Sequence, residues 1–246
     1  MTAALILAAG KGTRMGSDLP KPLVELNGQP IVSYIVDAFL KTGIHDIHMV
    51  VGHGAKKVMK AIGPQISYVH QTEQKGTAHA VMMSEDNIFE DHDHVFVFVG
   101  DSPLISAKSI KALYKHHIQT KASCTFLTSK FPFGLPYARV VRGENQRLLK
   151  CVEEKNASTS ELLINELLSS HFIFKVEDLY AYLEDIKPDK DNGELYLTDI
   201  INIFIQHHLP VETVFIENYA ELVGLNTPED LKWAESMLQN ALIKNK

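Results

Sequence analysis

The feature that most constrains the fold of this chain is the regular alternation of strand and helix patterns over its first half. The run Val-Phe-Val-Phe-Val at residues 95–99 is continuously apolar, which is typical of a strand buried on both faces of a parallel sheet. Strands are expected at residues 3–8, 46–51, 66–70, 94–100 and 122–128, and helices at 30–41, 55–62, 77–85 and 107–117. This alternation predicts a three-layer α/β fold with a mostly parallel sheet. Ligands of such folds bind beyond the carboxyl ends of the strands.

The pattern changes at residues 131–136, where the sequence Phe-Pro-Phe-Gly-Leu-Pro interrupts the alternation. Short strands are expected at residues 137–142, 148–153 and 170–175, and helices at 177–183, 198–207 and 228–242. We interpret residues 131–192 as a subdomain inserted into a single domain of residues 1–246, where it covers the carboxyl edge of the sheet. The last helix has a clear start, because Thr227 can cap it, Pro228 suits its first turn and Asp230 lies three residues past the cap.

A glycine-rich, cationic loop follows the first expected strand. It reads Ala-Ala-Gly-Lys-Gly-Thr-Arg-Met-Gly at residues 8–16 and is followed by Pro-Lys-Pro at 20–22. Small residues let backbone N–H groups approach a ligand, and Lys11, Arg14 and Lys21 add positive charge, a combination suited to polyphosphate. The spacing matches neither G-x-G-x-x-G nor G-x-x-x-x-G-K-[ST], which excludes the dinucleotide-binding fingerprint and the P-loop. An ordinary turn with solvated lysines is the alternative.

Two candidate metal ligands lie at the ends of regular elements. Asp101 comes directly after the apolar strand, where a carboxylate can hold a divalent metal facing the glycine-rich loop or can cap a turn. Together with that loop, the metal is favoured. Asn226 precedes the capped last helix, which would hold it rigidly, although taken alone it is more typical of a turn.

Other polar residues are candidates for ligand recognition. Gln71 lies near Gly76 and Thr77, at the start of an expected helix, and its amide can offer a donor and an acceptor to a planar base. The residues alone slightly favour a polar loop in which Thr77 caps the helix. Glu153, followed by Glu154, can accept hydrogen bonds from sugar hydroxyls, but by itself this pair is more typical of a solvated surface.

Composition and charge exclude several other functions. The net charge of −6 and the lack of a basic patch argue against a nucleic-acid partner. No signal peptide or membrane span is expected, and Cys124 and Cys151 are more typical of buried thiols than of a disulfide, so a cytoplasmic protein is expected. The 12 histidines, among them His48, His92 and His117, match no zinc motif and are interpreted as solvated residues of loops and helix ends. No G-x-S-x-G is present, which argues against a serine hydrolase.

Seven segments, taken in order, resemble the motifs of the nucleoside-triphosphate:sugar-1-phosphate nucleotidyltransferases. They are residues 7–15 with 20–21, 51–54, 71–80, 100–105, 152–155, 194–199 and 224–226. The resemblance is strongest to the N-terminal uridylyltransferase half of bifunctional N-acetylglucosamine-1-phosphate uridylyltransferases. It implies a three-layer, Rossmann-like nucleotidyltransferase fold with an inserted sugar-binding subdomain. The acetyltransferase half of that family has no counterpart in these residues, so no acetyltransferase activity is expected.

The resemblance also implies residue roles. Arg14 and Lys21 would be catalytic, and Asp101 and Asn226 would hold Mg²⁺. The nucleotide would be bound by Leu7, Ala8, Ala9, Gly10, Lys11, Gly12, Gln71, Gly76 and Thr77. The sugar would be bound by Gly100, Ala138, Glu153 and Ser169.

Two departures from the family pattern lie on the sugar side. Tyr137-Ala138-Arg139 stands where the family has Tyr-Gly-Arg, and Ser169-Ser170-His171 where it has Asn-Thr-Gly. The expected reaction is transfer of a uridylyl group from UTP to a sugar 1-phosphate, by default N-acetylglucosamine 1-phosphate. Another nucleotide or phosphate acceptor, or a catalytically silent sugar-nucleotide-binding module, remains open, and the sequence does not indicate the oligomeric state.

Overall fold

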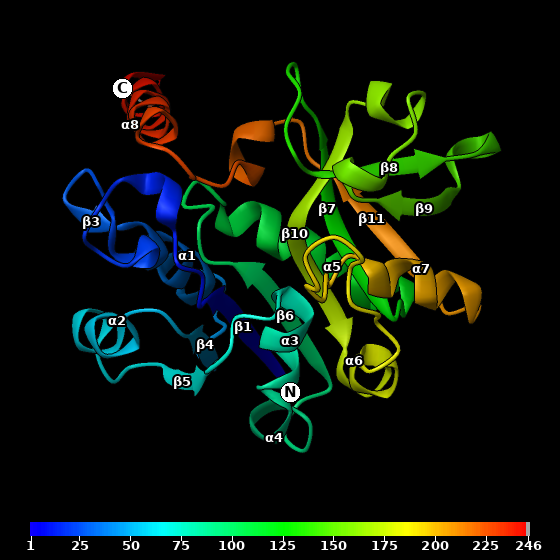
Figure 1. The fold of residues 1–246 in the computed structure, drawn as a ribbon, viewed down its shortest axis with the longest axis horizontal. Coiled ribbons are helices and arrows are strands. Elements are labelled where there is room, and N and C mark those ends of the chain that lie inside the picture. Colours follow the sequence, from blue (N-terminus) through cyan, green and yellow to red (C-terminus); the bar gives the residue numbers. More distant parts are fainter. Residues whose placement is uncertain (245–246) are drawn as a thin grey trace.

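A mixed β-sheet forms the centre of the computed structural model, which describes residues 1–244 and side chains up to residue 240 (Figure 1). Its strand order is β11-β7-β10-β6-β1-β4-β5, and β8 and β9 extend it beside β10. The strands are β1 (Thr2–Ala8), β4 (Ile47–Val51), β5 (Ser67–His70), β6 (His94–Val99), β7 (Cys124–Lys130), β8 (Ala138–Arg142), β9 (Leu148–Val152), β10 (Glu166–Lys175) and β11 (Val211–Phe215). The pairs of β1 with β4 and β6, of β4 with β5, and of β7 with β11 are parallel.

Helices cover both faces of this sheet. On one face, α1 (Ile31–Leu40), α2 (Ala55–Ile62), α5 (Ala107–Thr120) and α8 (Pro228–Lys244) pack on side chains such as Ile6, Phe96 and Phe98. On the other, α3 (Thr77–Met82), α4 (Glu85–Ile88), α6 (Val176–Leu183) and α7 (Asp199–Gln206) pack on Leu5 and Val97, among others. The expected three-layer α/β fold with a mostly parallel sheet is therefore confirmed.

The region expected as an insert differs from the prediction in one important respect. Its last strand, β10, begins at Glu166 and lies inside the central sheet, antiparallel to both β6 and β7. The hairpin of β8 and β9 extends from the start of β10, through pairing of β8 with Leu167 and Leu168. Of residues 131–192, β10 and the helix α6 therefore belong to the main layers. The antiparallel direction of β10 brings its amino-terminal residues to the edge where the parallel strands end.

Three further differences between the structure and the predicted elements are small. The edge strand β11 was not expected, because Glu212 and Thr213 interrupt its apolar residues and no position in it is fully buried. The hairpin of β2 (Glu25–Leu26) and β3 (Gln29–Pro30) is too short to leave a periodic signal. The expected helix at residues 77–85 is split into α3 and α4 around Ser84, whose hydroxyl donates to the carbonyl oxygen of Val81.

Burial confirms one expectation for titratable residues and corrects another. Cys124 and Cys151 are buried free thiols, as expected. The histidines, in contrast, are not all solvated: His48, His92, His117 and His171 are buried, because they face the interior from a strand or from the inner face of a helix or turn. Among the described residues, no helix is both long and apolar enough to cross a membrane.

Candidate active site

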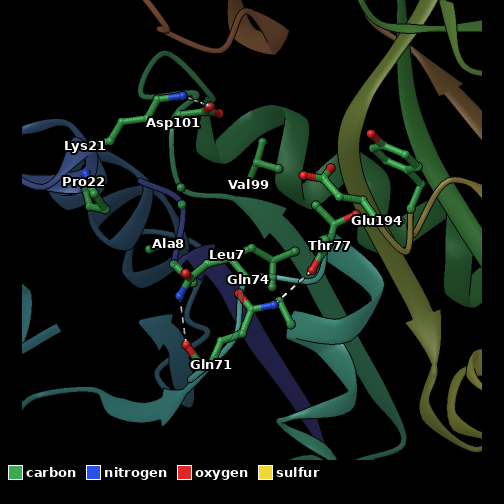
Figure 2. Close-up of a pocket in the computed structure, with 16 residues that line it drawn as sticks. Leu7, Ala8, Lys21, Pro22, Gln71, Gln74, Thr77, Val99, Asp101 and Glu194 are labelled. Atoms are coloured by element: carbon green, nitrogen blue, oxygen red, sulfur yellow. Dashed lines mark hydrogen bonds and ion pairs between the residues drawn. The ribbon is translucent and has the colours of Figure 1, made fainter. Parts of the chain in front are cut away.

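The carboxyl ends of the parallel strands bring most of the predicted site residues together. Gly10 follows β1, Gln71 follows β5 and Asp101 follows β6. Three adjoining pockets lie at this edge, named here the Gln71, Lys11 and Glu153 pockets after one lining residue of each. Figure 2 shows the Gln71 pocket, with Lys21 and Asp101 at one end and Gln71 and Gln74 at the other.

Two cationic side chains and two side-chain oxygens that accept their hydrogen bonds meet where the three pockets join. The Lys21 ammonium lies 2.5 Å from Asp101 Oδ2 and 2.8 Å from Asn226 Oδ1. Arg14 Nη2 donates to the same Asn226 oxygen at 3.0 Å. Lys21 and Asp101 line the Gln71 pocket, while Arg14 and Asn226 line both others. All four residues predicted as catalytic or metal-binding are thus in one cluster.

Asn226 is positioned by the start of α8. Thr227 Oγ1 accepts a hydrogen bond from the backbone N–H of Asp230, and Asp230 Oδ2 accepts from the backbone N–H of Thr227. This reciprocal pair is the capping box predicted for this helix. Asp230 Oδ2 also accepts from the N–H of Asn226 at 2.8 Å, and the Asn226 amide donates to the carbonyl oxygen of Gly224. The cap therefore fixes both the backbone and the side chain of Asn226.

The space beside Asp101 depends on a glycine. A Cβ atom at Gly224 would lie 2.9 Å from Asp101 Oδ1, so any side chain there would displace the carboxylate. The backbone carbonyl of Asp101 accepts from the N–H of Leu225, which ties the end of β6 to the Gly224 segment. Carboxylate and amide oxygens around one positively charged point are a donor set that suits a hard divalent cation such as Mg²⁺. Asp101 and Asn226 therefore fit the role predicted for them.

The Gln71 pocket contains the small residues and the glutamine predicted to bind a nucleotide. Its lining includes Leu7, Ala8, Ala9, Gly10, Gln71, Gly76 and Thr77, and also Gly100, which was expected on the sugar side. Thr77 does not cap α3. Its hydroxyl instead accepts from the backbone N–H of Leu197 at 2.9 Å and so ties α3 to the segment that follows Glu194.

The amide of Gln71 has a defined orientation. Its Nε2 lies 3.1 Å from the carbonyl oxygen of Gly76 and 3.0 Å from His79 Nδ1. Because a carbonyl oxygen only accepts hydrogen bonds, the amide nitrogen must face it. Gln71 Oε1 is then the polar atom of this buried side chain that is left to accept a hydrogen bond from a ligand.

The Lys11 pocket is formed by the glycine-rich loop. Its walls are Gly10, Lys11, Gly12, Thr13, Arg14, Lys21, Gln74, Glu194 and Asn226. Lys11 and Arg14 are exposed at this loop, and Lys21 is half-buried beside it. The cations therefore surround one concave, solvent-accessible site, as expected for binding an anion with several phosphate groups.

The Glu153 pocket brings together three of the residues expected to bind a sugar: Ala138, Glu153 and Ser169. Burial raises the pKa of Glu153, while the Thr198 hydroxyl acts in the opposite direction. Ser169 offers little to a ligand, because its hydroxyl donates to the carbonyl oxygen of Leu222 at 2.6 Å and lies 3.2 Å from His171 Nδ1. Burial lowers the pKa of His171 to about 4, so His171 adds no positive charge to this pocket at pH 7.

Several lining residues had no role assigned from the sequence. They are Gln74, Tyr137, Ser170, Glu194, Tyr196 and Thr198. Tyr196 borders both the Gln71 and Glu153 pockets, and the Lys155 ammonium lies 4.5 Å from the centre of its ring. The motif at residues 194–199 was the only signal for Tyr196, because nothing local indicates that this loop folds back over α3.

Comparison with known proteins assigns the family. Residues 4–169 match the model of the MobA-like NTP transferase domain. The chain belongs to this family. The resemblance to nucleotidyltransferases predicted from the motifs is thereby confirmed, and the chain is an enzyme of the nucleotidyltransferase class.

Curated relatives and a solved structure extend this result. The chain is 39% identical over 241 residues to the bifunctional protein GlmU of Staphylococcus haemolyticus, and 37% identical over 236 residues to that of Exiguobacterium sibiricum. These alignments cover 97% and 96% of this chain but 53% of each relative, so the chain spans about half the length of the curated relatives it matches. The solved structure of a putative glucose-1-phosphate thymidylyltransferase of Bacillus anthracis, in complex with a sucrose, shares the fold of this chain. The TM-score is 0.77 at 18% sequence identity, and the superposition covers 96% of this chain and 95% of the other.

Proposed function

We propose that this nucleotidyltransferase transfers a uridylyl group from UTP to a sugar 1-phosphate, with N-acetylglucosamine 1-phosphate as the default acceptor. The products would be a UDP-sugar and pyrophosphate. The observation that carries the proposal is the meeting of three pockets at Lys21, Asp101 and Asn226. A nucleoside in the Gln71 pocket, a triphosphate in the Lys11 pocket and a sugar in the Glu153 pocket would place their reacting phosphates at this junction.

The chemistry needs positioning and positive charge more than proton transfer. An oxygen of the sugar phosphate attacks the α-phosphorus of UTP in line, a P–O bond forms, and the bond to the β-phosphate breaks to release pyrophosphate. The attacking oxygen is already anionic, so no general base is required. Arg14 and Lys21 would neutralise the charge that builds up on the transferring and leaving phosphates. Both cations already lie within 3.0 Å of Asn226 Oδ1.

Asp101 and Asn226 are the residues that would hold Mg²⁺. Bound there, the ion would lower the negative charge on the reacting phosphates. Lys21 now occupies the space between the two oxygen donors, so it would turn toward the phosphates when the ion binds. Its four-carbon side chain permits that movement without a change in the backbone.

The choice of base rests on Gln71. With its Nε2 engaged by Gly76 and His79, its Oε1 offers an acceptor. Uracil and thymine carry a donor at N3, whereas cytosine has an acceptor at that position. An acceptor that faces N3 of the base would therefore favour UTP or dTTP over CTP, and the family resemblance favours uracil.

Pyrophosphate release in the presence of Mg²⁺, measured for each pairing of UTP, CTP, GTP and dTTP with several hexose and hexosamine 1-phosphates, tests the proposal. We expect the highest kcat/KM with UTP and N-acetylglucosamine 1-phosphate. Release with a different pair would keep the reaction and change the substrates. Binding of nucleotide without release from any pair would instead support a catalytically silent sugar-nucleotide-binding module.

Replacing Glu153 by Gln should weaken sugar binding but stabilise the fold at alkaline pH. The loss of a hydrogen bond to a charged acceptor predicts a KM for the sugar 1-phosphate raised about 10- to 100-fold. Because burial raises the pKa of Glu153, this carboxyl stabilises the fold below its unfolded-state pKa and loses that effect as the pH rises through its folded-state pKa. The Tm of Glu153→Gln should therefore exceed that of the parent at pH 8, and the difference should shrink toward pH 4.

Glu154→Gln is the matched control for this variant. Glu154 is the next residue, and its half-exposed carboxylate is 3.8 Å from Arg139. Its replacement should leave both the KM for the sugar and the pH dependence of Tm unchanged. Equal effects of the two substitutions would exclude a specific role for Glu153.

A further inference from the structure

A second cluster of polar residues lies at the opposite edge of the sheet from the three pockets. Asp46 immediately precedes β4, His48 is the second residue of β4, and His92 lies in the turn between α4 and β6. Each residue offers one atom that could bind a metal, and these three atoms all lie within 4.8 Å of one another. Among the described residues, no other three or more His, Cys, Asp or Glu side chains are grouped as closely. Because β4 and β6 are the two neighbours of β1, residues 46 and 92 meet despite their separation in sequence.

The hydrogen bonding of His92 directs one ring nitrogen at Asp46. Its Nδ1 lies 3.2 Å from the carbonyl oxygen of Ile88, which can only accept, so Nδ1 carries the hydrogen. In a neutral ring, Nε2 then has a lone pair, and it lies 2.7 Å from the carboxylate oxygen Oδ2 of Asp46. Two lone pairs at this distance require a proton or a metal cation between them. A ring N–H bonded to a backbone carbonyl is also the usual support of a metal-binding histidine.

His48 provides an independent observation. Its side chain is 8% exposed, and neither ring nitrogen has a hydrogen-bond partner among the described residues. Nε2 nevertheless lies 2.9 Å from Asp46 Oδ1, in a contact that lacks the alignment of a hydrogen bond. A buried polar ring without a partner is costly, and a ligand bound to it would remove that cost.

We propose that Asp46, His48 and His92 bind one divalent transition-metal ion of the zinc type. Two imidazole nitrogens and one carboxylate oxygen suit Zn²⁺ and its neighbours in the first transition row, whereas Mg²⁺ takes oxygen ligands. Ligand atoms of a tetrahedral zinc ion lie about 3.3 Å apart, given bonds of about 2.0–2.1 Å. His92 Nε2 lies 2.7 Å from Asp46 Oδ2 and His48 Nε2 lies 2.9 Å from Asp46 Oδ1, so small side-chain movements would bring both nitrogens and one of these oxygens to this spacing.

The site would stabilise the fold without taking part in the reaction. Bound metal would connect the start of β4 to the turn before β6. Six residues of β6 separate this edge from Asp101, a length of about 20 Å. Asp46 is 52% exposed, so water could reach an ion held there and complete its coordination.

Metal titration of the tag-free, metal-stripped full chain tests this site, with excess Mg²⁺ present to occupy oxygen ligands. We expect one equivalent of Co²⁺ to bind with visible d–d absorption, and Zn²⁺ to displace it. Zn²⁺ at about 100 times its Kd should raise the Tm by about 5–10 °C. Asp46→Asn and His92→Gln should lose both responses.

His45→Gln is the control, because His45 is an exposed histidine adjacent to Asp46 and outside the group. It should bind Co²⁺ like the parent. Asp46→Asn decides the result if His92→Gln does not fold, because the Asp46 side chain is half-exposed and its backbone carbonyl still accepts from Ala4. Parent protein without a Tm response to Zn²⁺, or Asp46→Asn that binds like the parent, would overturn the proposal and leave an Asp46–imidazolium ion pair.

Discussion

Asp101→Ala is expected to lower kcat by at least about a hundredfold while the fold is retained. The carboxylate contacts the Lys21 ammonium at 2.5 Å at the junction of the three pockets. Loss of one preorganised charge at a reacting centre typically costs about 10²–10³ in kcat. The backbone contact of Asp101 with Leu225 does not depend on the side chain, so the end of β6 should stay in place. Pyrophosphate release measured over a range of Mg²⁺ concentrations gives kcat, and circular dichroism checks the fold.

Two further variants make this test specific. Asp101→Asn keeps the size of the side chain and removes only its charge, so it should show most of the same loss and should need more Mg²⁺ to reach half of its maximal rate. Asp18→Asn removes an exposed carboxylate from the same region as Lys21 and should keep the parental kcat. Near-normal turnover of Asp101→Ala would remove Asp101 from the catalytic machinery.

A strand could be predicted from the sequence when its own residues showed a continuous apolar run. It could not be predicted when it depended on pairing with a distant segment. The strands β1 and β6 are buried on both faces, so their apolar runs predicted both the strands and the layered fold. β11 has no fully buried position, and its partner β7 lies more than 80 residues earlier, so no local pattern indicated it. The same holds for β10, whose antiparallel place between β6 and β7 depends on pairing and not on its own residues.

The same distinction applies to the residues of the candidate site. Gly10, Gln71 and Asp101 were predictable because each follows a parallel strand, and such strands end at one edge of a sheet. Side-chain partners were not: the contact of Gln71 with His79 and the placement of Tyr196 between two pockets depend on packing across α3. Asp46 and His92 likewise meet only because β4 and β6 flank β1, a relation that no spacing motif describes.

Gly76→Ala is expected to destabilise the protein and to impair the Gln71 pocket together. Gly76 has φ 103° and ψ 179°, a backbone conformation that is essentially restricted to glycine and costs other residues about 1–3 kcal/mol. A Cβ atom there would also lie only 2.4 Å from the carbonyl oxygen of Leu195 and 2.7 Å from its nitrogen. Both atoms are hydrogen-bonded, to Ala78 and Lys75, so the clash cannot be relieved by turning a side chain.

An alanine at position 76 must therefore displace the backbone at Leu195. The loop that holds Glu194 and Tyr196, which line the pocket, would move with it. We expect the Tm to fall by about 5 °C or more and the KM for the nucleotide to rise at least about tenfold. Gly134→Ala is the matched control, because a Cβ atom there meets no atom within 4 Å and its φ lies outside the left-handed region. Its Tm and KM should equal those of the parent, or its Tm should rise slightly through the lower entropy of the unfolded chain. A parental Tm and KM for Gly76→Ala would mean that the segment at Leu195 is free to move away from α3, and that the Gln71 pocket does not depend on their close contact.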